Sequence, residues 1–190
     1  TDSSVPQAIA VDQTGDIIVA GYFSGETDFG GTTINVSNAE VFVAKLDGMN
    51  GALKWVVSGG GIGTQQVTDV VVDAGGTIYV SGVTQNNILF GTNSYSVVGT
   101  QDSFVLKVST AGAFQSLTGY GIANQAVTLS NLAIDGSGDL YLGGSFEGTM
   151  AKNGWTITAN KGGADVFFIK EGATSANQWA ATGGSSSGDG

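Results

Sequence analysis

Apolar and polar residues alternate along this chain in the short-period pattern that is typical of β-strands. Segments such as AIAVD, DIIVAGYF, VFVAKLD and LKWVVSG are rich in β-branched and aromatic residues and are bounded by Gly, Asp, Asn and Ser. No glycine-free stretch places apolar residues at the helical spacing i, i+3, i+4 and i+7. The pattern predicts an all-β chain, with strands near residues 7–12, 16–23, 41–47 and 53–58 and an extra hairpin around 29–36.

The strand pattern occurs three times along the sequence. Residues 8–23 read AIAVDQTGDIIVAGYF, residues 69–84 read DVVVDAGGTIYVSGVT, and residues 131–146 read NLAIDGSGDLYLGGSF. Further on, EVFVAKL, DSFVLKV and DVFFIKE repeat in the same way. Four sets of residues keep this register of about 62 residues: Asp12, Asp73 and Asp135; Gly21, Gly82 and Gly144; Phe42, Phe104 and Phe167; Lys45, Lys107 and Lys170.

Several predicted strands are apolar on both faces, which indicates sheets that are covered on both sides. Four such strands in each of three repeats predict three four-stranded antiparallel blades of a β-propeller. WD-type blades are shorter, with Gly-His and Trp-Asp pairs, and parallel β-helix coils are shorter still, so both fit less well. We expect a single repeat domain over 1–190, with blades at about 5–62, 63–124 and 125–190, and we expect the three phenylalanines to be buried.

The repeat resembles the bacterial β-propeller family whose units are called SBBP repeats. The residues that carry the resemblance in the first repeat are Asp12, Gly15, Gly21, Phe29, Gly30, Glu40, Phe42, Lys45, Gly51, Trp55, Gly59 and Gly60. The departures are Glu40 in place of the usual aspartate, Thr77 after Gly76, and Ser116 where Trp55 and Trp179 stand in the other repeats. The resemblance implies a module of large secreted or surface-attached bacterial proteins, most of which have no assigned ligand.

Charge and composition exclude several classes of partner and chemistry. Sixteen acidic residues against six basic ones give a formal net charge of −10, which disfavours nucleic acids and anionic membrane surfaces. The chain has no cysteine and no histidine, so disulfides and the commonest metal ligands and general base are absent. We expect no cofactor, no metal and no insertion into a membrane. Richness in Gly, Ser, Thr and Asn favours a secreted or cell-surface location, and the start at Thr1 suggests a processed product or an excerpt.

The repeated polar residues have two interpretations each. Asp12, Asp73 and Asp135 begin the turns DQTGD, DAGGT and DGSGD, which suit a hairpin better than a calcium loop because each offers only one or two acids. Lys45, Lys107 and Lys170 are either anion-binding groups or structural residues, and their presence in every repeat favours a structural pairing with a nearby acid.

Candidate ligand-binding residues are those that break the repeat. Tyr95 and Trp155 lie in long, unequal loops and have no counterpart in every repeat. The turns at 12–16 and 47–51 should share one rim and the long loops the opposite rim, where we place any ligand. Carboxylate pairs such as Glu26 and Asp28 suggest acid–base chemistry only weakly, so we expect no enzyme.

Two functions from different classes remain. The first is a non-enzymatic extracellular module for adhesion, scaffolding or assembly through protein partners or further copies of the repeat; the second is a propeller that binds or cleaves carbohydrate. Propellers have about 4–8 blades, and three repeats that begin and end at the same phase would leave two blade faces open. We therefore expect a head-to-tail oligomer, with two chains giving six blades in a closed ring, or a part of a longer array.

Overall fold

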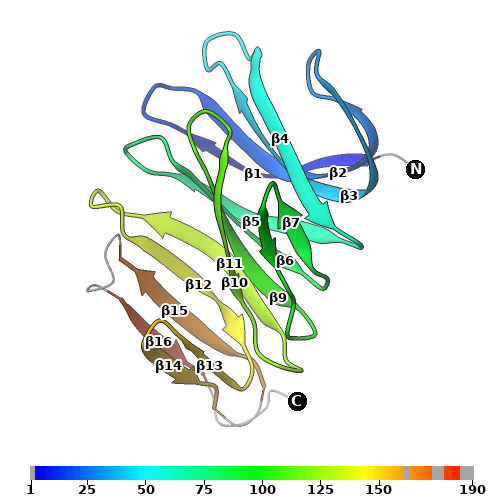
Figure 1. Ribbon diagram of the computed structural model, residues 1–190. Coiled ribbons are helices and arrows are strands. Elements are labelled where there is room, and N and C mark those ends of the chain that lie inside the picture. Colours follow the sequence, from blue (N-terminus) through cyan, green and yellow to red (C-terminus); the bar gives the residue numbers. More distant parts are fainter. Residues whose placement is uncertain (1–2, 161–162, 173–177, 185–190) are drawn as a thin grey trace.

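The computed structural model describes residues 3–160, 163–172 and 178–184, and these residues form strands and no helix. The prediction of an all-β chain is confirmed. Each repeat contributes four main strands that pair antiparallel in chain order, which gives three main sheets; the remaining short strands extend the first sheet or form a small sheet of their own. The three sheets follow one another from the top to the bottom of Figure 1, each laid face to face on the next.

The first sheet contains β1 (Ser3–Val11), β2 (Ile17–Asp28), β3 (Thr33–Leu46) and β4 (Leu53–Gly61). The second contains β5 (Gln65–Val72), β6 (Ile78–Thr84), β9 (Asp102–Val108) and β10 (Phe114–Tyr120). The third contains β11 (Val127–Ile134), β12 (Leu140–Phe146), β15 (Asp165–Glu171) and β16 (Trp179–Gly183). The predicted main strands are all present, and most lie within a few residues of their expected bounds; β2 ends five residues later and β3 begins eight residues earlier than predicted.

An extra hairpin occurs in each repeat, but its form differs. In the first repeat β2 and β3 continue past an irregularity near Phe23 and close at residues 29–32, so the predicted hairpin is an extension of two main strands. In the second repeat β7 (Ile88–Phe90) and β8 (Asn93–Tyr95) form a separate hairpin that pairs with the edge of β4. In the third repeat β13 (Thr149–Lys152) and β14 (Trp155–Thr158) form a sheet of their own.

The repeated glycine and phenylalanine form one packing unit. Gly21 is paired directly with Phe42 across β2 and β3, and the other two repeats have the same pairs. A Cβ at Gly21 would collide with the Val5 carbonyl oxygen and the Phe42 ring. Each glycine thus lets a phenylalanine ring lie across its own sheet, beside the register shift in the first strand of the repeat.

Every sheet has two unlike faces, which we name by their repeated residues. The phenylalanine face carries Phe42, Phe104 or Phe167, with 5%, 0% and 0% of each residue exposed, so their predicted burial is confirmed. The lysine face carries Lys45, Lys107 or Lys170 on the other side of the same strand. Val41 and Val43 on the lysine face of the first sheet pack with Phe104 and Leu106 on the phenylalanine face of the second.

The same arrangement joins the second sheet to the third. Val105 from the lysine face of the second sheet packs in one cluster with Phe167 and Ile169 from the phenylalanine face of the third. We call these contacts the first junction, between the first and second sheets, and the second junction, between the second and third. The first strands also touch across the junctions, because Val67 donates its N–H to Gln7 at 2.8 Å and Leu132 donates to Asp69 at 2.8 Å.

Candidate functional site

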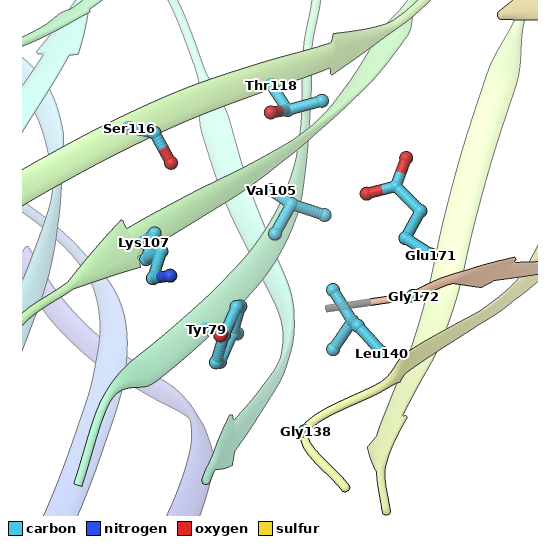
Figure 2. A pocket seen from close by; sticks show the side chains of 9 residues that line it. All are labelled: Tyr79, Val105, Lys107, Ser116, Thr118, Gly138, Leu140, Glu171 and Gly172. Carbon is cyan, nitrogen blue, oxygen red and sulfur yellow. The ribbon is translucent and has the colours of Figure 1, made fainter. Parts of the chain in front are cut away.

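The second junction contains a cleft of about 220 Å³ between the second and third sheets. Figure 2 shows its lining: Lys107 and Val105 of β9, Ser116 and Thr118 of β10, Tyr79 of β6, Leu140 of β12, Gly138 of the turn before it, and Glu171 with Gly172 at the end of β15. The ammonium group of Lys107 and the carboxylate of Glu171 point into the cleft from opposite sides. We call this the Ser116 cleft, after the residue that departs from the repeat.

Glu171 lines the cleft, but one of its two carboxylate oxygens is buried. Within the described ranges, this oxygen, Oε1 of Glu171, and the buried hydroxyl of Tyr120 nearby are both without a hydrogen bond of ordinary length and angle. Burial, together with the charge of Glu171, raises the pKa of Tyr120 well above its ordinary value, so this hydroxyl stays neutral. The Tyr120 hydroxyl lies next to the Glu171 carboxylate, and Lys152, whose Nζ is 4.4 Å from the centre of the Tyr120 ring, interacts electrostatically with the same carboxylate.

The corresponding place in the first junction is filled. Trp55 is paired with Lys45 across β3 and β4, just as Ser116 is paired with Lys107 across β9 and β10. The indole N–H of Trp55 donates to the carbonyl oxygen of Thr110 at 3.2 Å, and a Cβ at Gly112 would lie 3.0 Å from the ring. The tryptophan therefore seals the first junction against a turn of the next sheet.

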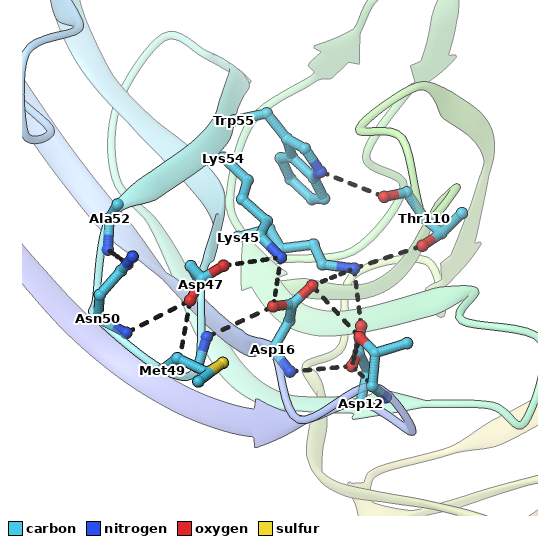
Figure 3. A network of polar contacts seen from close by, with 12 residues as sticks. Asp12, Asp16, Lys45, Asp47, Met49, Asn50, Ala52, Lys54, Trp55 and Thr110 are labelled. Atoms are coloured by element: carbon cyan, nitrogen blue, oxygen red, sulfur yellow. Dashed lines mark hydrogen bonds and ion pairs between the residues drawn. The ribbon is translucent and has the colours of Figure 1, made fainter.

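Lys45 of the first junction is the centre of a charged network (Figure 3). Its Nζ lies 2.7 Å from Asp12 and 3.2 Å from Asp16, with 8% of its side chain exposed, and it donates to the Thr110 hydroxyl of the second sheet at 3.5 Å. Lys54 extends the network, with its Nζ 2.6 Å from Asp16 and 3.3 Å from Asp47.

The network changes the pKa values of its members. Burial by itself raises the pKa of Asp12, but hydrogen bonds from Lys45 and Thr14 outweigh this and hold the pKa far below its usual range. Burial lowers the pKa of Lys45, and Asp12 and Asp16 more than compensate, so its pKa is raised. The hydrogen bond from Lys54 is the main cause of the lowered pKa of Asp16. All of these groups are held in their charged forms at neutral pH.

The other two repeated lysines differ from Lys45. Lys170 lies 2.7 Å from Asp139, which raises its pKa, so it has an acidic partner in its own repeat. Lys107 makes no ion pair in the part of the chain that the structure describes. Its Nζ lies 5.4 Å from the centre of the Tyr79 ring instead. The reason is Thr77, which stands in the second repeat where Asp16 and Asp139 stand in the others.

The repeated aspartates close hairpin turns. Oδ1 of Asp12 accepts hydrogen bonds from the N–H groups of Thr14 and Asp16, and Gly15 has a positive φ of 85°. Asp73 and Asp135 have the same two bonds in their own turns. In the described ranges, no group of three or more acidic side chains is placed to hold a metal ion.

The two predicted ligand residues are turned inward. Tyr95 is half-buried, its hydroxyl donates to Asp102 at 2.6 Å, and burial and this carboxylate raise its pKa. Trp155 is 9% exposed and packs in the core of the second junction, where its indole N–H has no hydrogen-bond partner among the residues that the structure describes. Glu26 and Asp28 are exposed on the extended hairpin of the first repeat.

Sequence reasoning named Ser116 only as a departure and did not single out Tyr79, Thr118 or Glu171. The available signal was the combination of two breaks in one repeat, at Thr77 and at Ser116, because both positions face the same junction. Glu171 carried no signal, since its position opposite Ser116 depends on how two sheets pack.

Comparison of the chain with known protein families and with curated proteins finds no match. The resemblance to SBBP repeats therefore stays a prediction. Among the described residues, no helix is long and apolar enough to cross a membrane.

Proposed function

We propose that this chain is a non-enzymatic module of propeller blades that assembles through its two outer sheet faces with further copies of the same repeat. The observation that carries the proposal is that residues buried inside the two junctions have exposed equivalents at both ends of the stack. Ile9 of β1 is 68% exposed, whereas its equivalents Val70 and Leu132 are 3% and 8% exposed. The lysine face of the third sheet leaves Phe168 53% exposed, whereas its equivalent Val43 is 1% exposed.

The occupant of these faces follows from the contacts within the chain. At each of the two junctions, the lysine face of one repeat packs on the phenylalanine face of the next. If the same contact forms once more, the lysine face of the third sheet packs on the phenylalanine face of the first sheet of another copy. Such a head-to-tail contact gives a closed ring when the rotation fits and a fibre when it does not. Exposed apolar patches of this kind mark interaction surfaces.

Trp179 gives the proposed contact a specific anchor. It is paired with Lys170 as Trp55 is with Lys45, but it is 46% exposed. Trp55 packs on the turn that contains Gly112, and the matching turn of the first repeat contains Gly51, whose φ of 72° resembles the 83° of Gly112. We expect Trp179 of one copy to pack on Gly51 of the next.

Native mass in solution tests the proposal. At micromolar concentration we expect a multiple of the protomer mass, with tryptophan emission that shifts to longer wavelength on dilution as Trp179 becomes solvated. Phe168→Asp and Ile9→Asp should each yield monomers. Val98→Asp is the matched control, because Val98 is 55% exposed in the loop between β8 and β9 of the middle repeat, outside both outer sheets, and the variant should leave the assembly intact. A compact wild-type monomer throughout this concentration range would refute the proposal.

Carbohydrate binding is a second candidate, supported by an uncharged polar patch on the rim of the long loops. Shallow pockets there are lined by amide side chains of Gln66, Gln85, Gln101, Asn86 and Asn87. Amides donate and accept hydrogen bonds, as sugar hydroxyl groups require. A glycan array with the wild-type chain and Gln85→Ala tests this candidate, and an absence of hits below millimolar concentration would exclude it.

A further inference from the structure

The outer strands of the first two sheets meet the next repeat in different ways. The end of β4 pairs antiparallel with β7, in the hairpin of the second repeat, and Gly60 stands opposite Leu89. The end of β10 pairs with no strand of the third repeat, because in the described part of the chain β13 and β14 pair only with each other. Lys152 of β13 donates from its side chain to the Gly119 carbonyl oxygen at 2.7 Å instead. The hairpin of a repeat therefore extends the previous sheet at the first junction and not at the second.

A single repeat position explains this difference. Gly59, Tyr120 and Gly183 are equivalent, since each is paired with the residue before the repeated phenylalanine. A Cβ at Gly59 would lie 2.6 Å from the Phe90 ring and 2.7 Å from the Leu89 carbonyl oxygen, so glycine is what lets the hairpin approach β4. The second repeat has Tyr120 there, whose buried side chain packs in the second junction. Glycine at this position permits the pairing, and a side chain prevents it.

Nothing among the described residues requires Gly183 to be a glycine. A Cβ there would meet only a methyl group of Val166, at an ordinary distance of 3.7 Å, and its φ lies outside the left-handed region. Glycine weakens the interior of a strand, and it often marks a place where another backbone comes close. In the described ranges β16 is the last strand of its sheet. Gly183 therefore suits an approaching backbone that the described chain does not itself supply.

The hairpin of the first repeat carries the residue that would make this contact. Phe29 and Phe90 are each followed by a glycine with a positive φ. The centre of the Phe29 ring lies 5.0 Å from that of Phe42, the repeated phenylalanine of its own sheet. The Phe90 ring lies 5.9 Å from Phe104 in the same way. Phe90 is only 1% exposed where the first sheet lies against it, whereas Phe29 is partly buried, so the first hairpin still has an uncovered side.

We propose that the extended hairpin of one copy adds a strand to the edge of β16 in another copy, with Phe29 lying on Gly183. This contact repeats the one between Phe90 and Gly59. The hairpin and β16 lie at opposite ends of the stack, so one chain cannot make the contact with itself (Figure 1). Residues 27–29 supply main-chain hydrogen bonds to the edge, as strands added to a sheet do. The inference rests on the proposed head-to-tail assembly and specifies how its rim is joined.

Gly183→Ala tests the strand pairing, because it adds only the Cβ that would meet the hairpin. The chain itself should fold normally, since that Cβ has room among the described residues. Sedimentation should show assembly weakened by roughly tenfold, because part of the clash is with a main-chain oxygen. Gly136→Ala is the matched control. A Cβ there meets nothing within 4 Å, and its equivalent Ala74 stays exposed although the second sheet is covered on both faces.

Hydrogen–deuterium exchange detects the pairing itself. In the assembled wild type, amide protons within residues 27–29 that point away from β3 should exchange at least roughly tenfold more slowly than in the Phe168→Asp monomer. A wild type that stays monomeric would refute both the assembly and the strand pairing. An assembled wild type without this protection, or undiminished assembly of Gly183→Ala, would refute the strand pairing alone and leave the head-to-tail contact standing.

Discussion

The first and second junctions share the same packing of repeated residues but differ in the side chains at their rim. Both pack a lysine face on a phenylalanine face, and both bury a phenylalanine completely or nearly so. In the first, Trp55 and the acidic partners of Lys45 close the gap between the sheets. In the second, Ser116 stands in place of the tryptophan beside a cleft, Thr77 replaces the acid, and Lys107 has no ion pair among the described residues. The comparison teaches that the repeated residues make the stack, while two variable positions decide whether a junction is sealed.

The largest expected effect tests what the junctions share. Phe104→Ala and Phe167→Ala should each lower the free energy of unfolding by about 3–5 kcal/mol, because both rings are fully buried at a junction and truncation leaves a cavity. Denaturant unfolding followed by circular dichroism measures the losses. Val98→Ala, in the exposed loop before β9, should change stability by only about 0.5 kcal/mol because Val98 is 55% exposed. A small effect of Phe167→Ala would show that the second junction is not packed like the first.

The next effect concerns the repeated lysines. Lys45→Met should cost about 2–3 kcal/mol, since it leaves Asp12 and Asp16 close together without their shared cation; the loss is below that of a deeply buried pair because the network lies at a rim. Lys107→Met should cost about 0.5 kcal/mol or less because Lys107 has no ion pair with any described residue. Chemical unfolding of both variants measures the difference. Equal costs would mean that the ion pairs of Lys45 are not what distinguishes the junctions.

The effect of Lys45→Met should depend on pH. The folded-state pKa of Asp12 is lowered, so its contribution to stability is present above the unfolded pKa of about 4 and is lost as the pH falls towards the folded value. The raised pKa of Lys45 places the loss of its own contribution at alkaline pH, above about 10.4. Thermal melts from neutral to acidic pH should show wild type approaching Lys45→Met below about pH 4. A constant gap would contradict the assignment to Asp12.

The smallest expected change in stability comes from exchanging the residue types at the equivalent positions Trp55 and Ser116. Trp55→Ser should cost about 1–2 kcal/mol, because the ring is only half-buried and one hydrogen bond to Thr110 is lost. Ser116→Trp should stabilise the chain by about 0.5–1 kcal/mol by filling the cleft. Melting temperatures of both variants measure the exchange. Destabilisation by Ser116→Trp would show that the cleft does not have the shape of the Trp55 site.

Much of the fold could be predicted because its signals are local. Period-two apolar patterns, the Asp-x-x-Gly turns and the threefold repetition identified the twelve main strands and the burial of the three phenylalanines. The extra hairpins were harder to predict, because their pairing depends on which strands lie beside them in the folded chain. For example, β7 pairs with β4 of the previous repeat, and no local pattern in the sequence of β7 indicates that partner. The inward positions of Tyr95 and Trp155 were missed for the same reason.

The sequence by itself determined that this chain forms antiparallel strands, where their turns lie, and which faces carry apolar side chains, because these properties depend on residues a few positions apart. Only the tertiary structure decided that Glu171 stands opposite Lys107 and that Thr110 and Gly112 meet Trp55, because those pairs are more than fifty residues apart and meet only when two sheets pack. Packing energy between sheets, rather than any local preference, brings these groups together. The difference between a sealed junction and an open cleft is therefore a property of the stacked sheets and not of any single repeat.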